Sequence, residues 1–401
     1  MSTEWREVPL GVVASLDIET VEVTEGTKFR FAGLYNEGRG LFDRGWLTDS
    51  DTSYPRLHVL RPDQLVMRKL TAWEGPISVV PKRFDGYVVS PEFPTFKLDQ
   101  DLILPEYAAL VCQHPSFWAQ LASKATGSVQ RRKRVSPKQL LSIGILLPPV
   151  PQQQRIIDLI SSVDQYIAAC ERQSNAASDT LQAVSSACFG AGNAPMLSLA
   201  SVAEVQIGRQ RSPKHVDGDN MVPYLRSANV KDGRLRLDDV LSMNFAPSEQ
   251  QVFALREGDV LVTEGSASEQ QVGAAAVWQA ELPGMICFQN TLLRLRGKPS
   301  GYTAGFLYHW ARWAYRSGLL ASVASGTNIK HIGAQRMARI PVPAYPEKMQ
   351  VRWQQDLDEL TKVEHATRQV LRSTIDLRDS LIGDLLSGRH QIPEAYHALL
   401  H

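Results

Sequence analysis

The sequence predicts an α+β protein with two similar α/β domains, joined by two long antiparallel coiled-coil helices and related by an internal pseudo-two-fold repeat. Three observations lead to this prediction. A set of motif residues recurs 197 positions further along the chain. A narrow apolar seam of heptad spacing follows the motif in the first half, and short β-rich segments precede the motif in both halves.

The repeat is a duplication of a whole domain-plus-helix unit. Its period is far longer than the roughly 20–50 residues of a solenoid repeat, so each copy is large enough to fold as a domain. Two similar modules in one chain can recognise two similar but different targets. The matched pairs are Pro149 and Pro346, Gln153 and Gln350, Arg155 and Arg352, Val135 and Ile332, and Ile143 and Ile340.

The composition is that of an ordinary globular protein. The length of 401 residues predicts two or three domains, and the net charge of +1 means that any nucleic-acid site must be a local basic patch. Four scattered cysteines without a Cys-x-x-Cys pair argue against a zinc ribbon and a disulfide framework. Neither a signal peptide nor an apolar run of about 20 residues is visible, so we expect a cytoplasmic location and no membrane contact.

Residues 1–148 are expected to form the first globular domain. Short segments rich in β-branched and aromatic residues, separated by Gly and Pro, predict its strands. A helix is expected over 105–122, with an interruption near Pro115. The expected strands are 28–31, 64–67, 77–80 and 86–89.

Residues 149–190 are expected to form the first long helix and its linker. From Ile156 onward, apolar or small residues alternate at steps of four and three over more than four heptads, which is the pattern of a coiled-coil seam. At 1.5 Å per residue the helix would be about 55–60 Å long, so it needs a partner helix. The seam positions are Ile156, Ile160, Val163, Ile167, Cys170, Ser174, Ala177, Leu181, Val184 and Cys188.

The second half repeats this order of elements. Residues 196–345 are expected to form the second globular domain, 346–388 the second long helix, and 389–401 a C-terminal tail. Within the second domain the expected elements are strands near 222–225, 259–262 and 291–295 and a helix over 302–320.

The seam of the second helix follows from moving the first seam by 197 positions. Glu364 and Arg378 are polar members, so this seam is less regular than the first. The simplest burial pairs the two helices with each other, antiparallel; the alternative is that each helix packs on its own domain. The transferred positions are Trp353, Leu357, Leu360, Glu364, Thr367, Leu371, Thr374, Arg378, Leu381 and Leu385.

We find no motif that would bind a catalytic cofactor or metal. There is no Gly-rich loop between a strand and a helix for a nucleotide or S-adenosylmethionine, and no Gly-x-Ser-x-Gly sequence. Asp85, Glu92 and Lys97 roughly match a nuclease metal set, but Pro94 would break the strand that positions the carboxylate. We therefore expect a non-catalytic chain that binds no cofactor or metal of its own.

Basic loops occupy the same place in both copies. Residues 131–134 (Arg-Arg-Lys-Arg) follow a turn at Gly127, and Lys330 and His331 follow a turn at Gly326. Such side chains bind phosphate, and arginine also reads guanine edges. The alternative is a solvated basic turn, which the repetition disfavours. The predicted DNA-contacting residues are Arg39, Arg44, Lys69, Lys124, Arg131, Arg132, Lys133, Arg134, Arg209, Arg226, Asn229, Lys330 and His331.

In these motifs the chain resembles the specificity subunit of type I restriction–modification systems over essentially its whole length. The most specific mark is the entry into each long helix, where proline is followed by Gln-x-Arg. The second copy departs from this pattern, because residues 341–346 (Pro-Val-Pro-Ala-Tyr-Pro) stretch the proline pair. The resemblance rests on residues 31–35, 38–44, 69–75, 90–94 and 148–156 in the first copy and on 207–213, 258–265 and 288–290 in the second.

The resemblance implies a function. Each globular domain would be a target recognition domain for one half of a split, asymmetric sequence in double-stranded DNA. The helices would set the gap and dock two methyltransferase (modification) subunits and a restriction/translocase subunit, which alone would hold S-adenosylmethionine, ATP and Mg. Three alternatives stay open: the specificity subunit of a methyltransferase–nuclease that cuts outside a split site, a fused methyltransferase or nuclease, and a coiled-coil protein-interaction scaffold without DNA binding.

Overall fold

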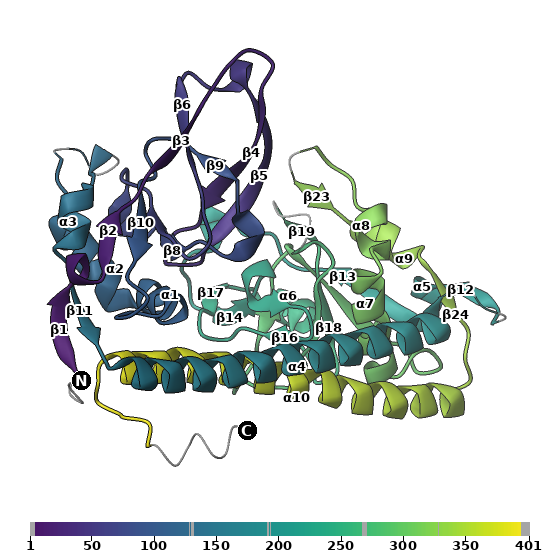
Figure 1. Cartoon of the computed structure of the whole chain (residues 1–401). Helices are drawn as coiled ribbons and strands as arrows, with labels where there is room; N and C mark the ends of the chain where they lie inside the picture. Colours follow the sequence, from purple (N-terminus) through teal and green to yellow (C-terminus); the bar gives the residue numbers. More distant parts are fainter. Residues whose placement is uncertain are drawn as a thin grey trace. The chain divides into compact units, whose positions relative to one another are not determined.

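The chain divides into two compact units in a computed structural model (Figure 1). The model describes residues 5–127, 129, 132–190, 192, 194–266, 271–327 and 329–393. The first unit comprises Met1–Cys170 and Leu371–His401, and the second comprises Glu171–Val370. Each unit therefore contains one globular domain and about half of each long helix.

The first domain is built on a four-stranded antiparallel sheet and a short two-stranded ladder. The sheet runs in the order β2 (Ala14–Leu16), β10 (Thr95–Leu98), β7 (Leu65–Met67) and β8 (Ile77–Val79), and the ladder pairs β1 (Arg6–Pro9) with β11 (Gly144–Leu147). A second, five-stranded sheet runs in the order β3 (Glu19–Glu22), β6 (Arg56–Val59), β9 (Val88–Val89), β4 (Lys28–Leu34) and β5 (Leu41–Thr48).

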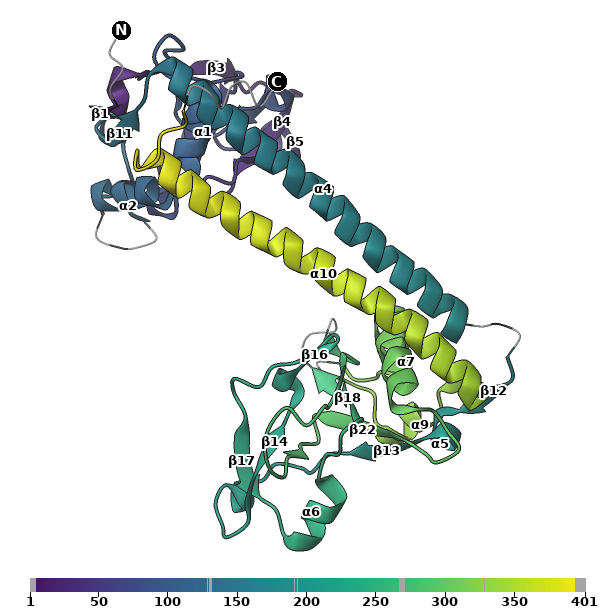
Figure 2. The same ribbon diagram turned by 90° about the horizontal axis from the view of Figure 1, so that it is seen from below.

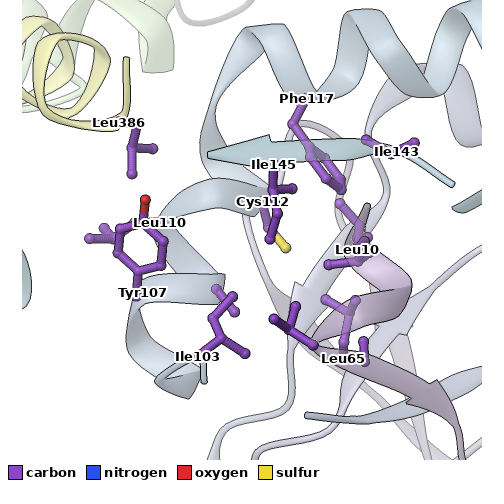
Figure 3. Packing of buried hydrophobic residues seen from close by; sticks show 14 of the residues in the cluster. Leu10, Leu65, Ile103, Tyr107, Leu110, Cys112, Phe117, Ile143, Ile145 and Leu386 are labelled. Atoms are coloured by element: carbon purple, nitrogen blue, oxygen red, sulfur yellow. The ribbon is translucent and has the colours of Figure 1, made fainter. Parts of the chain in front are cut away.

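Two short helices complete the core of this domain. The helix expected over 105–122 is two helices, α1 (Pro105–Gln113) and α2 (Pro115–Lys124), because Pro115 cannot donate a helical hydrogen bond. The Nδ1 of His114 accepts from Ser116 N (3.3 Å) and caps the second helix. Figure 3 shows Tyr107 and Phe117 packed in the same cluster as residues of the sheet and of α10.

The second domain repeats the first sheet with the same strand order. The four-stranded antiparallel sheet runs β13 (Ala203–Ile207), β22 (Leu292–Gly297), β18 (Val260–Thr263) and β20 (Ala275–Val277), and the ladder pairs β12 (Met196–Ser198) with β24 (Pro341–Pro343). The internal repeat predicted from the sequence is therefore confirmed in the topology.

The two domains differ outside this shared sheet. In place of the five-stranded sheet, the second domain has a three-stranded sheet and two short ladders. These are β17 (Leu241–Asn244), β14 (Met221–Leu225) and β21 (Cys287–Phe288), then β15 (Val230–Lys231) with β16 (Arg234–Leu235), and β19 (Gly265–Ser266) with β23 (Lys330–His331). The duplication thus keeps a common core and varies the sheet attached to it.

The expected helix over 302–320 is also divided. It consists of α7 (Ala304–Arg316) and α8 (Leu319–Val323), with Gly318 between them at φ 79°. This left-handed conformation ends a helix and favours glycine. The remaining short helices of the described residues are α3 (Pro137–Leu141), α5 (Leu199–Val202), α6 (Pro247–Phe253) and α9 (Ala334–Ala338).

The two long helices, α4 (Val150–Phe189) and α10 (Glu347–Leu386), have 40 residues each. Figure 2 shows them side by side and antiparallel. In the first unit Arg378 of α10 donates to Asp164 of α4, and in the second unit Ser178 Oγ donates to Glu364 Oε1 (3.1 Å). The predicted pair of long antiparallel helices is confirmed.

The seam of each helix is shared between the partner helix and a domain core. Ile156, Ile160 and Leu385 belong to the core of the first unit, and Leu181 and Leu357 belong to the core of the second. Each long helix therefore packs both against the other long helix and against a domain, although we had treated these arrangements as alternatives. Of the other seam positions, Cys170, Ser174, Cys188, Glu364, Thr367 and Thr374 are buried, while Val163, Ile167, Ala177, Val184, Trp353, Leu360, Leu371, Arg378 and Leu381 are half-buried.

The glutamine of the repeated motif anchors each long helix to its domain. Gln153 Oε1 accepts from Leu104 N (2.8 Å), and its Nε2 donates to the carbonyls of Leu102 (2.8 Å) and Pro148 (2.9 Å). Gln350 makes the equivalent bonds in the second unit, to Thr303 N (2.9 Å), Gly301 O (3.1 Å) and Tyr345 O (2.9 Å). One side chain thus satisfies three buried or partly buried backbone groups where the long helix meets α1 or α7.

We expect Gln153→Leu and Gln350→Leu each to destabilise their own unit by about 3 kcal/mol or more. Each substitution leaves one N–H and two C=O groups in the interior without a partner, at about 1–3 kcal/mol per group. Thermal and denaturant unfolding of the two variants would measure the loss. Gln154→Leu is the matched control, because Gln154 is exposed and bonds only Asp158 of its own helix (2.8 Å). A loss no larger than that of the control would contradict the anchoring role.

Candidate nucleic-acid interface

The two basic loops are closed in the same way in both domains. Thr126 and Arg134 exchange two backbone hydrogen bonds (both 2.9 Å), and Ser325 and His331 do the same (3.0 and 2.8 Å). Arg134 and His331 are 197 positions apart and so are equivalent in the repeat, whereas Thr126 and Ser325 are 199 apart, because the first loop is two residues longer. Of the loop residues, 128, 130, 131 and 328 lie outside the described residues, and the prediction for Arg131 stays a prediction.

Each loop is tied at its base to the end of a core strand. Val135 N donates to Lys69 O (3.1 Å) just after β7, and Ile332 N donates to Glu264 O (2.9 Å) just after β18. Both Val135 and Ile332 are fully buried. Because a buried apolar residue follows each basic loop, the end of the loop is fixed to the domain core. The basic side chains therefore project from a fixed part of the surface.

A carboxylate lies beside each closing residue. Arg134 Nη1 donates to Glu92 Oε1 (3.2 Å), and Lys69 Nζ lies 3.8 Å from the same oxygen. In the second domain Glu264 Oε2 lies 2.8 Å from Nδ1 of His331, and its Oε1 accepts from Gly333 N (3.2 Å). Glu92 thus neutralises part of the positive charge at the base of the first loop, and Glu264 fixes the position of the His331 ring in the second.

Arg134 and His331 remain partly exposed in these pairs, and further basic side chains lie beyond them. Arg132 and Lys124, at the end of α2, are exposed, and Lys133 is half-buried. In the second domain Lys330 is half-buried, and Arg336 braces the loop by donating to the carbonyls of Ile332 (2.7 Å) and His331 (2.9 Å). The first loop thus presents more exposed charge than the second.

Arg39 lies in the turn between β4 and β5, and Arg44 lies within β5. Arg39 is exposed, and its Nε donates to Asn36 O (3.2 Å) while the guanidinium lies 5.6 Å from the centre of the Tyr35 ring. Gly38 has φ 62°, and a Cβ there would lie 2.2 Å from the carbonyl oxygen of Cys112. The turn is therefore pressed against α1. Arg44 is exposed on β5.

Arg209 and Asn229 require a correction, because the structure places both in the interior. Arg209 is 7% exposed, and it donates to Glu249 Oε1 (2.8 Å) and to Asn244 O (2.8 Å). Burial alone would raise the pKa of Glu249, but the bonds from Arg209 and Ala246 N hold that pKa below its ordinary value. Arg209 is thus a structural residue, which DNA cannot reach in this conformation.

Asn229 is 2% exposed and uses its amide within the domain. Its Oδ1 accepts from Arg226 N (3.0 Å), and its Nδ2 donates to the carbonyls of Arg236 (2.8 Å) and Asp239 (2.9 Å). Arg226 itself is half-buried, with Nη2 donating to Asp239 Oδ2 (2.5 Å). Residues 226–229 therefore form a tight turn, and the DNA contact predicted for Asn229 is not supported.

Sequence reasoning missed Arg68, which joins the segments around the first loop. Its Nη2 donates to Asn36 Oδ1 (3.1 Å), Thr71 Oγ1 (2.6 Å) and Glu74 Oε2 (3.2 Å). Arg68 links the β4–β5 turn to residues 69–75, two motifs that we had considered separately. An arginine directly after a buried strand was the available signal, but its partners lie in other parts of the sequence.

Neither a metal site nor a membrane span is found in the described part of the chain. No group of three or more His, Cys, Asp or Glu side chains there could hold a metal ion. None of the helices in those ranges is long and apolar enough to cross a membrane.

Comparison with known proteins gives a fold but no sequence family. No family model matches this sequence, and no curated protein sequence is significantly similar to it. Solved structures do match. One comes from work on complex assembly and conformational transition of the type I R-M system, with 18% identity, a TM-score of 0.66, and coverage of 95% of this chain and 97% of that chain.

Two further structures match over similar lengths. The HsdS subunit from Thermoanaerobacter tengcongensis is 20% identical with a TM-score of 0.50, covering 96% of this chain and 97% of its own. The type I restriction–modification S subunit from M. genitalium is 12% identical with a TM-score of 0.50, covering 96% of both chains. Over nearly its whole length, the chain has the fold of the specificity subunits of type I restriction–modification systems.

Proposed function

We propose that this chain is the DNA-reading specificity subunit of a type I restriction–modification system and has no catalytic activity of its own. One observation carries the proposal. Two domains share a sheet core and an equivalently closed basic loop, but they differ in the sheet attached to that core. Equivalent loops suit contacts to the uniform phosphate backbone, and different attached sheets suit the reading of different bases.

The proposed DNA target is split and asymmetric. Each domain reads one half, and the paired helices set the gap between the halves. Arg132 and Lys124 are the leading phosphate contacts of the first domain, because both are exposed. The coiled-coil scaffold without DNA binding, our alternative, leaves the repeated basic loops without a role.

The exposed faces of the long helices support a role in docking partner subunits. Tyr166, Val363, Val370 and Leu377 are 57%, 51%, 46% and 62% exposed, so the helix pair carries apolar surface that a bound protein would cover. Each lies one position before a seam residue, so they flank the seam. We infer that two methyltransferase subunits cover these positions, that a restriction subunit joins them, and that S-adenosylmethionine, ATP and Mg bind only to these partners.

Selection from random double-stranded DNA tests the proposed function. The chain assembled with modification subunits from the same genome should enrich a sequence with two specified parts and an unspecified gap. Modification subunits alone are the control and should enrich nothing. Enrichment of one continuous site, or of none by the full assembly, would contradict a two-domain reader.

Neutralising Arg131, Arg132 and Arg134 with glutamine is expected to weaken DNA binding by the assembled complex. If these residues bind phosphate, the slope of log affinity against log salt should fall by roughly one for each arginine–phosphate pair that the substitutions remove. If one of them reads a base, specificity should relax at one position of one half-site. Titrations over a range of salt concentrations measure both effects.

Lys138→Gln is the matched control for this loop, because Lys138 is an exposed cation on α3 of the same domain. It should leave affinity and salt slope nearly unchanged. If the loop variant also kept the wild-type salt slope, the loop would be a solvated basic turn that does not bind DNA phosphates. Arg134 is paired with Glu92 in the free protein, whereas Arg132 is exposed. We therefore expect Arg132→Gln to lower DNA affinity more than Arg134→Gln.

A further inference from the structure

The second domain is attached to α10 through polar contacts along the length of α7. At the start of α7, Thr303 Oγ1 donates to Gln354 Oε1 (3.2 Å). Further along the helix, Nε2 of the buried His309 lies 2.8 Å from Asp358 Oδ1. The hydrogen bond from His309 is the main reason that the pKa of Asp358 is below its ordinary value. This polar contact surface ends in a cluster of buried charges.

The cluster is centred on Glu364, which is 2% exposed in the middle of the α10 seam. Arg316 donates to both of its carboxylate oxygens (2.9 and 3.1 Å), and Arg312 Nη2 donates to Oε2 (3.3 Å). Arg368 Nη2 lies 2.9 Å from Oε1. Asp232, in the turn between β15 and β16, accepts from Arg312 (3.1 Å) and Arg316 (2.7 Å).

The cluster therefore ties three elements of the second unit together. These are the long helix α10, the domain helix α7, and the turn between β15 and β16. Ser178 of α4 also donates to Glu364 (3.1 Å), so both long helices take part. Burial alone would raise the pKa of Glu364, but Arg316 and the other arginines hold it below its ordinary value, and the carboxylate stays ionised.

A buried charge cluster is weak evidence for stability, because desolvation offsets much of the attraction between the charges. Its geometry is nevertheless demanding, since each donor must meet a particular oxygen. The best-attested use of such groups is to fix one register among several that apolar packing would allow. In this unit the register in question is that of the domain on the helix pair.

The first copy shows that the fold does not need this cluster. The position equivalent to Glu364, 197 residues earlier, is Ile167, and the position equivalent to Gln354 is Ile157. Ile157 packs against the core of the first unit, beside Ile156 and Ile160. At these two positions the first copy thus has apolar residues, whereas the second copy has polar and charged side chains that bond to the domain.

We propose that Glu364, acting through Arg312 and Arg316, is a positioning residue that fixes the orientation of the second domain on the helix pair and so the placing of its half-site. The claim about the half-site rests on the proposed DNA-reading function. The claim about the orientation of the domain concerns only the second unit and can be measured without DNA. The cluster is proposed to select one orientation of the domain, not to raise the free energy of unfolding.

The test replaces the cluster with apolar and neutral residues in the full-length protein. The variant combines Glu364→Leu, Arg312→Met, Arg316→Met and Asp232→Asn. We expect its thermal unfolding midpoint to equal or exceed that of the wild type, because replacing buried ion pairs by apolar residues removes the desolvation cost. Spin labels at Ser248→Cys on α6 and Gln355→Cys on α10, both exposed, report the domain–helix distance. All four native cysteines are buried, which favours labelling of the introduced ones.

The expected result is a broader distance distribution between the two labels than in the wild type at unchanged stability. In the assembled complex, the variant should also methylate sites whose gap differs by one base pair, with both half-sites kept. Equal distribution widths would overturn the proposal. Absence of a split target for the wild-type complex would instead contradict the proposed function, and the distance measurement would still decide the positioning role.

A second variant covers the case in which the first does not fold. Arg316→Lys keeps the positive charge but cannot make the two parallel bonds to Glu364. Its distribution should be broader than that of the wild type, and a wild-type width would count against the proposal. Glu359→Gln is the matched control on the same helix, because the Glu359–Lys362 pair is exposed and should leave the distribution unchanged.

Discussion

Replacing Ile160 and Val163 with aspartate is expected to detach α4 from the first domain and to abolish recruitment of the methyltransferase subunits. Ile160 is 2% exposed in the core that also holds Ile156 and Leu385, and Val163 is half-buried one turn further along. An aspartate at position 160 would lie among the apolar side chains of this core, so the introduced carboxylates should cost several kcal/mol. Circular dichroism melting and co-purification with the modification subunits measure the two effects.

Ser162→Asp is the control for this experiment, because Ser162 is an exposed residue between the two substituted positions. It adds a carboxylate to the same turn of helix without burying it, and both stability and recruitment should be retained. A doubly substituted protein that melts and assembles like the control would contradict the role of the seam.

Lengthening both long helices by four residues should widen the gap of the recognised sequence by one or two base pairs. The pairs Asp164–Arg378 and Ser178–Glu364 share one antiparallel register, which places Arg172 opposite Val370. Insertions after Arg172 and after Gln369 therefore keep the helices matched. Each adds about 6 Å, and because four residues are close to one turn, the outward faces are nearly kept despite a stutter in the seam.

The control for the insertion is the same four residues placed after Gly192, in the linker. The linker lies between α4 and β12, so neither long helix changes length. This variant should methylate the original sequence with the original gap. If the helix insertions also left the gap unchanged, the helices would not set the spacing.

The sequence predicted the long helices closely because their information is local and repetitive. The predicted bounds, 149–190 for the first helix with its linker and 346–388 for the second helix, lie within two residues of Val150–Phe189 and Glu347–Leu386. The motif glutamines were found as a repeat, but their role was not. Gln153 bonds backbone groups about 50 residues away, and such partners leave no local pattern in the sequence.

The candidate DNA contacts were predicted less well, for a physical reason. An arginine on a loop has the same sequence signature whether it meets phosphate or a carboxylate of its own chain. Arg209 meets Glu249, 40 positions away, and is buried, whereas Arg132 is exposed. The polar residue Glu364 likewise weakened the predicted seam, because its partners Arg312 and Arg316 lie on a different element.

Mapping of adenine methylation in cells with and without this gene tests the central claim most directly. The account predicts that one split, asymmetric sequence loses its methylation when the gene is deleted and regains it when the intact chain is restored. A chain with the substituted first loop should restore methylation at sites with the same gap. The methylation should be weaker, or the sequence of the first half-site should be less strictly required. An unchanged methylome, or loss of methylation at a continuous sequence, would contradict a reader with two domains on a helical spacer.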